Sequence, residues 1–340
     1  LGETLTDSFT AATADGTTQV VTVTITGVNE AITAIQLSDV EVGLGGFVIN
    51  GVSAYDNSGF SVSSAGDVNG DGFDDLIVGA YRDDPNGSYS GASFVVFGKT
   101  DGAAIELSDV EAGTGGFVIN GVSASDQSGY SVSSAGDVNG DGFDDLIVGA
   151  LGDDPNGSSS GASFVVFGKA DGTAVALSDV EAGTGGFVIN GVSTGDRSGR
   201  SVSSAGDVNG DGFDDLIVGA PYDDPNGSYS GASFVVFGKA DGTAVEMSAV
   251  EAGTGGFVIN GSVYDNSGWS VSSAGDVNGD GFDDLIVGAR KDRPNGSYSG
   301  ASFVVFGKAD GTAVELSAVE AGKGGFVING VSAYDYSGWS

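Results

Sequence analysis

The sequence predicts an all-β protein, a β-propeller of four-stranded antiparallel blades that is incomplete, with about four to five blades in this chain. The first observation is a repeat: the stretch at residues 67–75 returns nearly unchanged at 137–145, 207–215 and 276–284, at spacings of 70, 70 and 69 residues. The second is that each unit holds four short apolar runs separated by Gly-rich turns, and the third is that no convincing helix is visible. A β-solenoid is the alternative, but the unit is too long for one coil.

Residues 1–30 differ from the rest and are assigned to a separate domain. Residues 19–26 alternate apolar side chains with Thr, which is typical of a half-buried strand, and Asp15-Gly16 is a hairpin turn signal after a strand near residues 8–12. Two strands alone are marginally stable. The sequence therefore predicts the closing hairpin of a β-sandwich, with residues 27–30 as a linker and the propeller at 31–340.

The strands of the repeating unit can be placed from the first copy. We expect them at residues 46–50, 60–65, 76–80 and 93–98. Residues 83–87 form a turn, because Pro stands at its second position and Gly follows Asn. A longer connection at 99–115 leads to the next copy.

The repeated nine-residue stretch has the donors of a calcium loop. Oxygen-bearing groups stand at loop positions one, three, five, seven and nine: Asp67, Asn69, Asp71, the backbone carbonyl of Phe73, and Asp75. Hard oxygen donors at alternating positions, with a glycine at position six, suit calcium. The beginning matches an EF-hand loop, but position twelve is Val78 and an apolar strand follows. We therefore expect the ion on a strand-to-strand turn.

Other readings of this stretch are weaker. Asp, Asn and Gly also cluster in turns without any ion, but four copies that keep every donor favour calcium. Magnesium prefers few protein ligands, and a nonapeptide calcium roll needs a period near nine. We predict about four structural Ca²⁺ ions, held by Asp67, Asn69, Asp71, Phe73, Asp75, Asp137, Asn139, Asp141, Phe143, Asp145, Asp207, Asn209, Asp211, Phe213, Asp215, Asp276, Asn278, Asp280, Phe282 and Asp284.

The amino-acid composition excludes several classes of partner and of catalytic chemistry. Lys plus Arg number 11 against 47 Asp plus Glu, so the net charge is −36. Such a surface repels nucleic acid and anionic lipid, so neither is expected as a partner. The absence of Cys and His removes thiol nucleophiles, Ser-His-Asp catalysis and most transition-metal sites. No apolar run is long enough to span a membrane. Weak calcium sites fill where calcium is millimolar, so we expect an extracellular location.

The motifs together resemble the FG-GAP repeats of integrin α-chain propellers. The similarity lies in Gly59-x-x-Val62-x-x-x-Gly66-Asp67, in the calcium loop and in the strand at 75–80, and the third copy spells Gly219-Ala220-Pro221. The order Gly59-Phe60 is reversed from the family label. The resemblance implies seven-bladed propellers with calcium between the first two strands of a blade. Residues 1–30 resemble the end of a VCBS-type, cadherin-like bacterial repeat, and both ends of the chain suggest a fragment of a longer protein.

One face is predicted to hold a ligand. In an antiparallel blade the loops at 51–59 and 81–91 lie at the end opposite the calcium loops, and many differences between the copies fall there or beside them. Aromatic and Arg side chains often anchor interfaces, although drift at exposed loops and core packing are alternative explanations. The candidates are Tyr55, Tyr81, Arg82, Tyr222, Trp269, Arg290 and Lys291.

The function expected from the sequence is binding. We predict a calcium-rigidified extracellular module of a large bacterial adhesin or surface protein, with a protein or glycan ligand on that face and further blades and domains in the same polypeptide. No catalytic residue is assigned, because the clustered Asp residues are explained by the loops. The alternatives are the accessory or catalytic propeller of a secreted glycan- or lipid-directed hydrolase, and a passive spacer.

Overall fold

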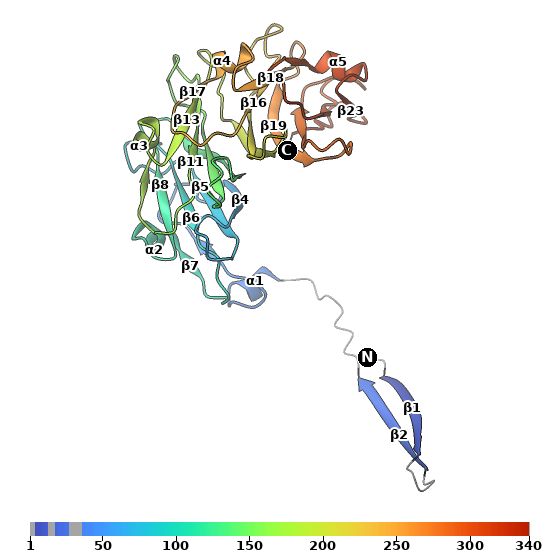
Figure 1. Ribbon diagram of the computed structural model, residues 1–340. Coiled ribbons are helices and arrows are strands. Elements are labelled where there is room, and N and C mark those ends of the chain that lie inside the picture. The colour runs from blue at the N-terminus through green and yellow to red at the C-terminus, as the bar shows by residue number, and fades with distance from the viewer. Residues whose placement is uncertain (1–3, 13–17, 27–35, 340) are drawn as a thin grey trace. The chain divides into compact units, whose positions relative to one another are not determined.

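The computed structural model describes residues 4–12, 18–26 and 36–339 (Figure 1). The chain divides into two compact units, Leu1–Val48 with Asp101–Ala104, and Ile49–Thr100 with Ile105–Ser340. In the first unit, β1 (Thr4–Ala12) and β2 (Thr18–Thr26) pair in antiparallel fashion, and the helix α1 (Leu37–Val40) follows. An antiparallel strand pair thus stands where the sequence predicts one, its assignment to a β-sandwich stays a prediction, and its turn at Asp15-Gly16 and the linker at 27–30 lie outside the described residues.

The second unit contains four antiparallel four-stranded sheets, and we call these sheets blades one to four. Within each blade the strands lie side by side in chain order. In order, the blades are β4 (Ser61–Gly66), β5 (Asp75–Ala80), β6 (Ala92–Val96) and β8 (Gly116–Asn120); β9 (Ser128–Gly136), β10 (Asp145–Ala150), β11 (Ala162–Val166) and β13 (Gly186–Asn190); β14 (Ser201–Gly206), β15 (Asp215–Ala220), β16 (Ala232–Val236) and β18 (Gly256–Asn260); β19 (Ser267–Gly275), β20 (Asp284–Ala289), β21 (Ala301–Val305) and β23 (Gly325–Asn329).

Short strands add to the outer edges of the first three blades. Each pairs in parallel with the fourth strand of the blade before it: β12 (Val175–Ala176) with β8, β17 (Val245–Glu246) with β13, and β22 (Val314–Glu315) with β18. The pair of β3 (Ile49–Asn50) and β7 (Ile105–Glu106) has the same arrangement ahead of blade one.

None of the short helices in the described residues was predicted from the sequence, and besides α1 there are four in the second unit. They are α2 (Leu107–Glu111), α3 (Leu177–Glu181), α4 (Met247–Glu251) and α5 (Leu316–Glu320), and Figure 1 shows them on the outer side of the blades. Each buries an apolar pair three residues apart, such as Leu107 and Val110 in α2. Five residues are too few to show a helical period, which explains why the pattern was missed.

The boundary of the repeating unit also differs from the prediction. The run expected to open each unit, at 46–50 in the first copy, closes the preceding blade instead: its equivalents β8, β13, β18 and β23 are the fourth strands. The Asp-rich loops therefore connect the first and second strands of each blade. The loops at 81–91 and 121–127 lie at the other end, as expected for antiparallel connections.

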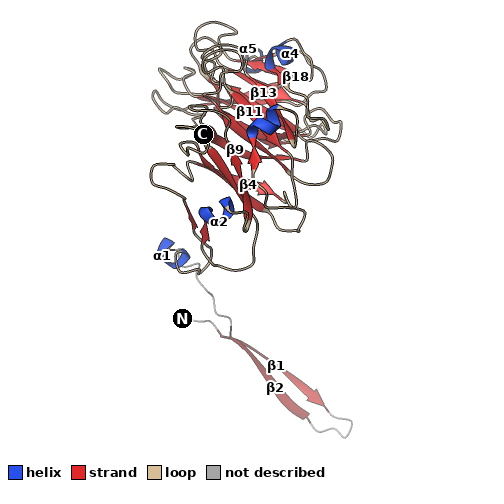
Figure 2. Ribbon diagram, turned by 90° about the vertical axis from the view of Figure 1, so that its left-hand side faces the viewer, coloured by secondary structure: helices blue, strands red, loops and turns tan. Residues whose placement is uncertain are grey.

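The core lies between successive blades. The first strand of each blade contacts the first strand of the next: β4 contacts β9, β9 contacts β14, and β14 contacts β19. Figure 2 shows strands of different blades in adjacent layers. Between blades one and two, for example, Phe117 and Phe164 are buried in one apolar cluster. This arrangement is consistent with propeller blades, although in the described part of the chain no hydrogen-bonded sheet joins β19 to β4.

Candidate calcium loops and the opposite face

The loop between β4 and β5 is held in shape by its own side-chain oxygens. Oδ1 of Asp67 accepts hydrogen bonds from the N–H groups of Gly70 (2.8 Å) and Asp71 (3.0 Å). Oδ1 of Asn69 accepts from the N–H of Asp71 (2.8 Å), and Oδ1 of Asp71 from the N–H of Phe73 (2.9 Å). Gly70 has a φ of +73°, which glycine adopts without strain. Equivalent bonds recur in the other three loops.

Asp75 lies beneath its loop, fully buried. Its oxygens accept hydrogen bonds from the N–H of Val68 (3.1 Å) and the N–H of Gly98 (2.7 Å). Burial raises the pKa of Asp75 to about 6 despite these donors, and the nearby carboxylates of Asp67 and Asp71 raise it further. Burial likewise raises the pKa values of two of its equivalents, Asp145 and Asp215, to about 7. A cation beside this carboxylate would favour its charged form.

The donor set fits calcium. Each ionised carboxylate offers about four lone-pair positions, so an oxygen that accepts a loop N–H retains capacity for an ion. The predicted donors of each loop all lie within one nine-residue stretch, and the buried carboxylate under the loop has negative neighbours but no positive one among the causes of its raised pKa. Among the described residues, no three acidic side chains already surround one ion position. Ligation by each predicted residue therefore stays a prediction.

The structure reveals a connection between loops that the sequence reasoning missed. Oδ2 of Asp144 in blade two accepts a hydrogen bond from the N–H of Asp67 in blade one (2.7 Å). The ring of Phe143 lies against Gly70, where a Cβ would come within 2.5 Å of Cε1. The sequence predicts a role only for the backbone carbonyl of Phe143, not for its ring. The available signal was the Asp-Asp pair in all four loops, of which the ligand pattern used only the second member.

At the opposite end, two of the predicted ligand residues form a stacked column. The guanidinium carbon of Arg290 lies 3.0 Å from the ring centroid of Trp269 and 4.6 Å from that of Trp339. Arg200 contacts the Trp269 ring at 3.7 Å and donates a hydrogen bond from Nη1 to the hydroxyl of Tyr130 (2.7 Å). Cation–π stacking is therefore one role of Trp269 and Arg290, and the contact of Arg200 with Trp269 joins blade three to blade four.

The remaining candidates on this face are placed differently. Tyr81 is only 8% exposed and packs against Phe60, with ring centroids 4.7 Å apart, so it belongs to the packing of the blade and not to an open surface. Arg82 is exposed and lies 5.2 Å from the Tyr81 ring. Tyr55 is 88% exposed. Lys291 is partly buried, which lowers its pKa.

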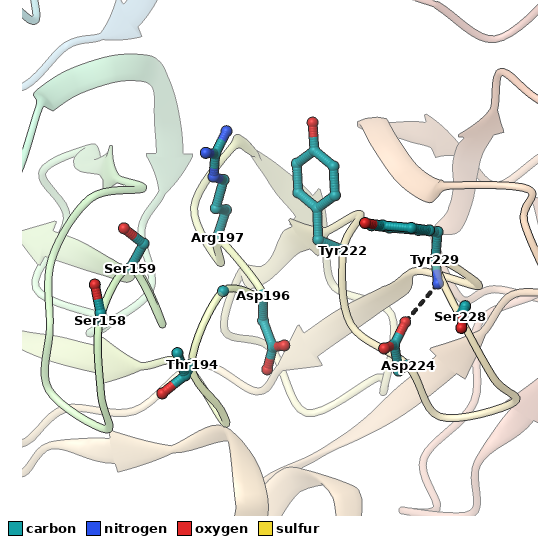
Figure 3. Close-up of a pocket in the computed structure, with 10 residues that line it drawn as sticks. Ser158, Ser159, Thr194, Asp196, Arg197, Tyr222, Asp224, Ser228 and Tyr229 are labelled. Carbon is teal, nitrogen blue, oxygen red and sulfur yellow. Dashed lines mark hydrogen bonds between the residues drawn. The ribbon is translucent and has the colours of Figure 1, made fainter.

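Tyr222 lines a cavity of about 570 Å³ at the same end (Figure 3). The cavity lies between the loop after β10, the segment after β13 and the loop after β15. The guanidinium of Arg197 lies 5.2 Å from the Tyr222 ring, and the ring of Tyr229 stands edge-on at 6.1 Å. Other lining residues are Ser158, Ser159, Thr194, Gly195, Asp196, Asp224 and Ser228. The face predicted to bind a ligand therefore contains a cavity next to Tyr222, one of the predicted ligand-binding residues.

Comparison with known proteins identifies the repeats. Residues 58–96, 128–166, 198–236 and 267–305 match the FG-GAP repeat family. Each match contains the first three strands of one blade and its Asp-rich loop, so the loops are typical of FG-GAP calcium-binding sites. In the described part of the chain, no helix is long and apolar enough to cross a membrane.

Whole-chain similarity points in the same direction. The chain is 30% identical over 243 residues to integrin alpha-5 of Xenopus laevis and 31% identical over 246 residues to integrin alpha pat-2 of Caenorhabditis elegans. It is 29% identical over 214 residues to phosphatidylinositol-glycan-specific phospholipase D of Bos taurus. The matches cover 70%, 71% and 62% of this chain, but only 20%, 18% and 24% of those proteins.

The chain therefore contains FG-GAP repeats homologous to those of integrin α chains, and it spans about a fifth of the length of these relatives. All three relatives are animal proteins. The comparisons support neither the bacterial origin nor the VCBS-type resemblance expected from residues 1–30.

Proposed function

We propose that this chain is an extracellular, calcium-stabilised adhesion or ligand-binding module whose four Asp-rich loops each bind one structural Ca²⁺. The observation that carries the proposal is the recurrence, at the same turn of four blades, of alternating oxygen donors above a buried carboxylate. The similarity to FG-GAP repeats and to integrin α chains supports it.

Calcium has a physical task in this arrangement. The chain carries a net charge of −36, and the loop carboxylates lie close enough to raise the pKa of the buried one between them. Four divalent ions would offset eight negative charges, leaving about −28. Each ion would tie the first strand of a blade to the second. Because neighbouring loops are hydrogen-bonded to one another, ordering one loop also orders the junction to the next blade.

We propose that the partner, a protein or a glycan, binds at the end opposite the loops. The cavity beside Tyr222 and the exposed ring of Trp339, which stacks on Arg290 beside Trp269, support this location. Tyr222→Ala should weaken binding to a ligand found in a glycan and matrix-protein screen, and the exposed helix variant Asp109→Asn is the control. If Tyr222→Ala and Trp269→Ala leave every measured affinity unchanged, the module is a passive spacer.

A second candidate is an accessory module of a secreted hydrolase, which the similarity to a phospholipase D favours. We propose that the chain itself performs no catalysis, because its buried carboxylates recur from blade to blade instead of forming one singular site. Turnover of a glycan or phospholipid panel by the purified chain would contradict this.

The test of the main proposal is calcium titration by calorimetry together with melting in calcium and in chelator. We expect the wild type to bind at least four ions and to melt at a clearly higher temperature in calcium. The double variant Asp137→Asn/Asp141→Asn should bind one ion fewer, and Asp109→Asn the same number as wild type. A melt indifferent to chelator, with no heat of calcium binding, would show that these loops are only turns.

A further inference from the structure

The cavity of Figure 3 lies between blades two and three, and one residue that lines it differs from its equivalents in the other blades. Ser159 stands where the other three blades have a tyrosine: Tyr89, Tyr229 and Tyr298. The φ angle of Ser159 is +50°, and those of the three tyrosines are +57°, +55° and +55°, so the backbone conformation is the same. The cavity therefore lies where blade two lacks an aromatic side chain that the other blades carry.

Blade four shows what such a ring contacts. The ring of Tyr298 stacks on the ring of Tyr336, from the segment after β23, with centroids 5.7 Å apart and planes inclined by 8°. The N–H of Tyr336 donates a hydrogen bond to the carbonyl of Tyr298 (3.0 Å). In the same way, the N–H of Arg197 donates to the carbonyl of Ser159 (3.1 Å). Arg197 therefore occupies the position of the residue on which the tyrosine stacks, but the ring itself is missing at this junction.

The guanidinium of Arg197 is suited to receive a ring. It lies 5.2 Å from the centroid of the Tyr222 ring, and Figure 3 shows the Arg197 side chain between Ser159 and Tyr222. Among the described residues, no carboxylate forms an ion pair with it. Planar guanidinium groups stack well on aromatic faces, and this chain already uses the pairing in blade one, where Arg82 lies 5.8 Å from the centroid of the Tyr89 ring.

The polar lining of the cavity favours a ring that carries a hydroxyl group. Ser158, Ser159 and Thr194 contribute hydroxyl groups, and Asp196 contributes a carboxylate. A phenol both donates and accepts hydrogen bonds, whereas a phenyl ring would leave these groups without partners when it displaces water. Tyrosine is also among the side chains that contribute most to binding at protein interfaces. The chemistry of the cavity therefore fits tyrosine better than phenylalanine.

We propose that this cavity binds a tyrosine side chain of a protein partner, in the place that the chain's own tyrosines occupy in the other three blades. The incoming ring stacks on the guanidinium of Arg197, and its hydroxyl group exchanges hydrogen bonds with the polar lining. The assignment rests on the ligand face proposed above. It goes further by choosing a protein partner over a glycan and by naming the side chain that enters.

The test is a ligand-observed NMR titration of the full chain, in calcium, with the peptide acetyl-Gly-Tyr-Gly-amide and its phenylalanine counterpart. We expect a Kd on the order of 1 mM for the tyrosine peptide, because one side chain makes few contacts, and weaker binding of the phenylalanine peptide. Ser159→Tyr places the chain's own ring in the cavity, so it should abolish binding without lowering the melting temperature. Ser159→Ala leaves the space open and should bind as wild type. Arg197→Met should weaken binding by roughly two- to fivefold.

The inference is wrong if the tyrosine peptide does not bind, or if Ser159→Tyr binds it as wild type does. If Ser159→Tyr does not fold, the inference is wrong when Arg197→Met and Ser159→Ala bind the peptide equally well. A glycan that binds wild type but not Ser159→Tyr, when the tyrosine peptide does not bind, would overturn this inference and leave the proposed ligand face intact. Calcium titration tests the loops separately, because Ser159→Tyr and Arg197→Met should bind as many ions as wild type.

Discussion

Oδ2 of Asp214 lies 2.9 Å from the backbone nitrogen of Asp137, so a carboxylate of blade three holds the first residue of the Asp-rich loop of blade two. The same bond joins blades one and two and blades three and four. The loops are therefore not independent turns. Each loop is hydrogen-bonded to the loop of the next blade, so calcium bound in one blade would also stabilise its neighbour.

This bond can be tested by removing its acceptor. Asp214→Ala should lower the free energy of unfolding by roughly 1–3 kcal/mol, because a charge-assisted hydrogen bond between blades is lost and the Asp137 N–H is left without its acceptor. Asp214→Asn keeps an acceptor oxygen and should lose less. The control is Asp74→Ala at the same position of blade one, where the side chain is exposed and no hydrogen bond to it is found in the described structure. Equal losses in urea denaturation for Asp214→Ala and Asp74→Ala would contradict the inter-blade role.

A second prediction concerns the phenylalanine of each loop. A Cβ on Gly210 would lie 2.6 Å from Cε1 of Phe282 in the next blade, whereas a Cβ on Gly279, at the same loop position of blade four, meets nothing within 4 Å. Their φ angles are +76° and +78°, so the backbone strain of an alanine is matched. Gly210→Ala should therefore destabilise by roughly 1–3 kcal/mol more than Gly279→Ala, which is the range for forced overpacking. Thermal melting of both variants measures the difference, and a difference near zero would rule out close packing of Phe282.

A third prediction concerns the column at the opposite end. Arg200→Met keeps the aliphatic bulk but removes the hydrogen bond to Tyr130 and the contact with the Trp269 ring. We expect a loss of roughly 1–3 kcal/mol in the free energy of unfolding. The protein has only two Trp residues, and Arg200 contacts the ring of one of them, Trp269, so the emission spectrum should change as well. Arg82→Met removes only an exposed guanidinium 5.2 Å from the Tyr81 ring, so it should cost less stability and leave the Trp emission unchanged.

The blade architecture was predictable because each strand and turn has a recognisable pattern of neighbouring residues. The strand at Asp75–Ala80 contains an uninterrupted apolar run at residues 76–80 between turn signals. Its recurrence in four copies makes the assignment unambiguous. The unit boundary was not predictable, because Gly116–Asn120 pairs with a strand that precedes it in the chain by about twenty residues. Only the hydrogen-bonded register shows to which blade that strand belongs.

The candidate site was predictable to the same degree. The donors of the Asp-rich loop follow from spacing alone, since Asp67, Asn69 and Asp71 are near neighbours in the chain. The partner of Asp144 was not visible, because its hydrogen bond with the N–H of Asp67 joins residues from different blades. Arg293 did stand out in the sequence, but its influence on the more distant Asp265 depends on the fold.

The last prediction is an unusual pH dependence in the absence of calcium. Burial, followed by neighbouring negative charge, raises the pKa values of Asp126, Asp223 and Asp265 to about 7 and that of Asp196 to about 6. The unfolded chain loses these protons near the ordinary value of 3.8. Between about pH 4 and about pH 7 the folded state therefore holds protons that the unfolded state has released, and its stability falls as the pH rises.

Carboxyl groups whose pKa is lowered in the folded state do not change the expected stability in this pH range. Lys169 lowers the pKa of Asp171, and stability linked to such a group is lost only as the pH falls below the ordinary value. In chelator, urea denaturation should thus show a lower free energy of unfolding at about pH 7.5 than at about pH 5. Asp126→Asn should flatten this slope and Asp109→Asn should not. Excess calcium should reverse the slope, because an ion that binds the ionised carboxylates is displaced by protons. If the free energy of unfolding in chelator rises from pH 5 to pH 7.5, the protonation assigned to these four aspartates is contradicted.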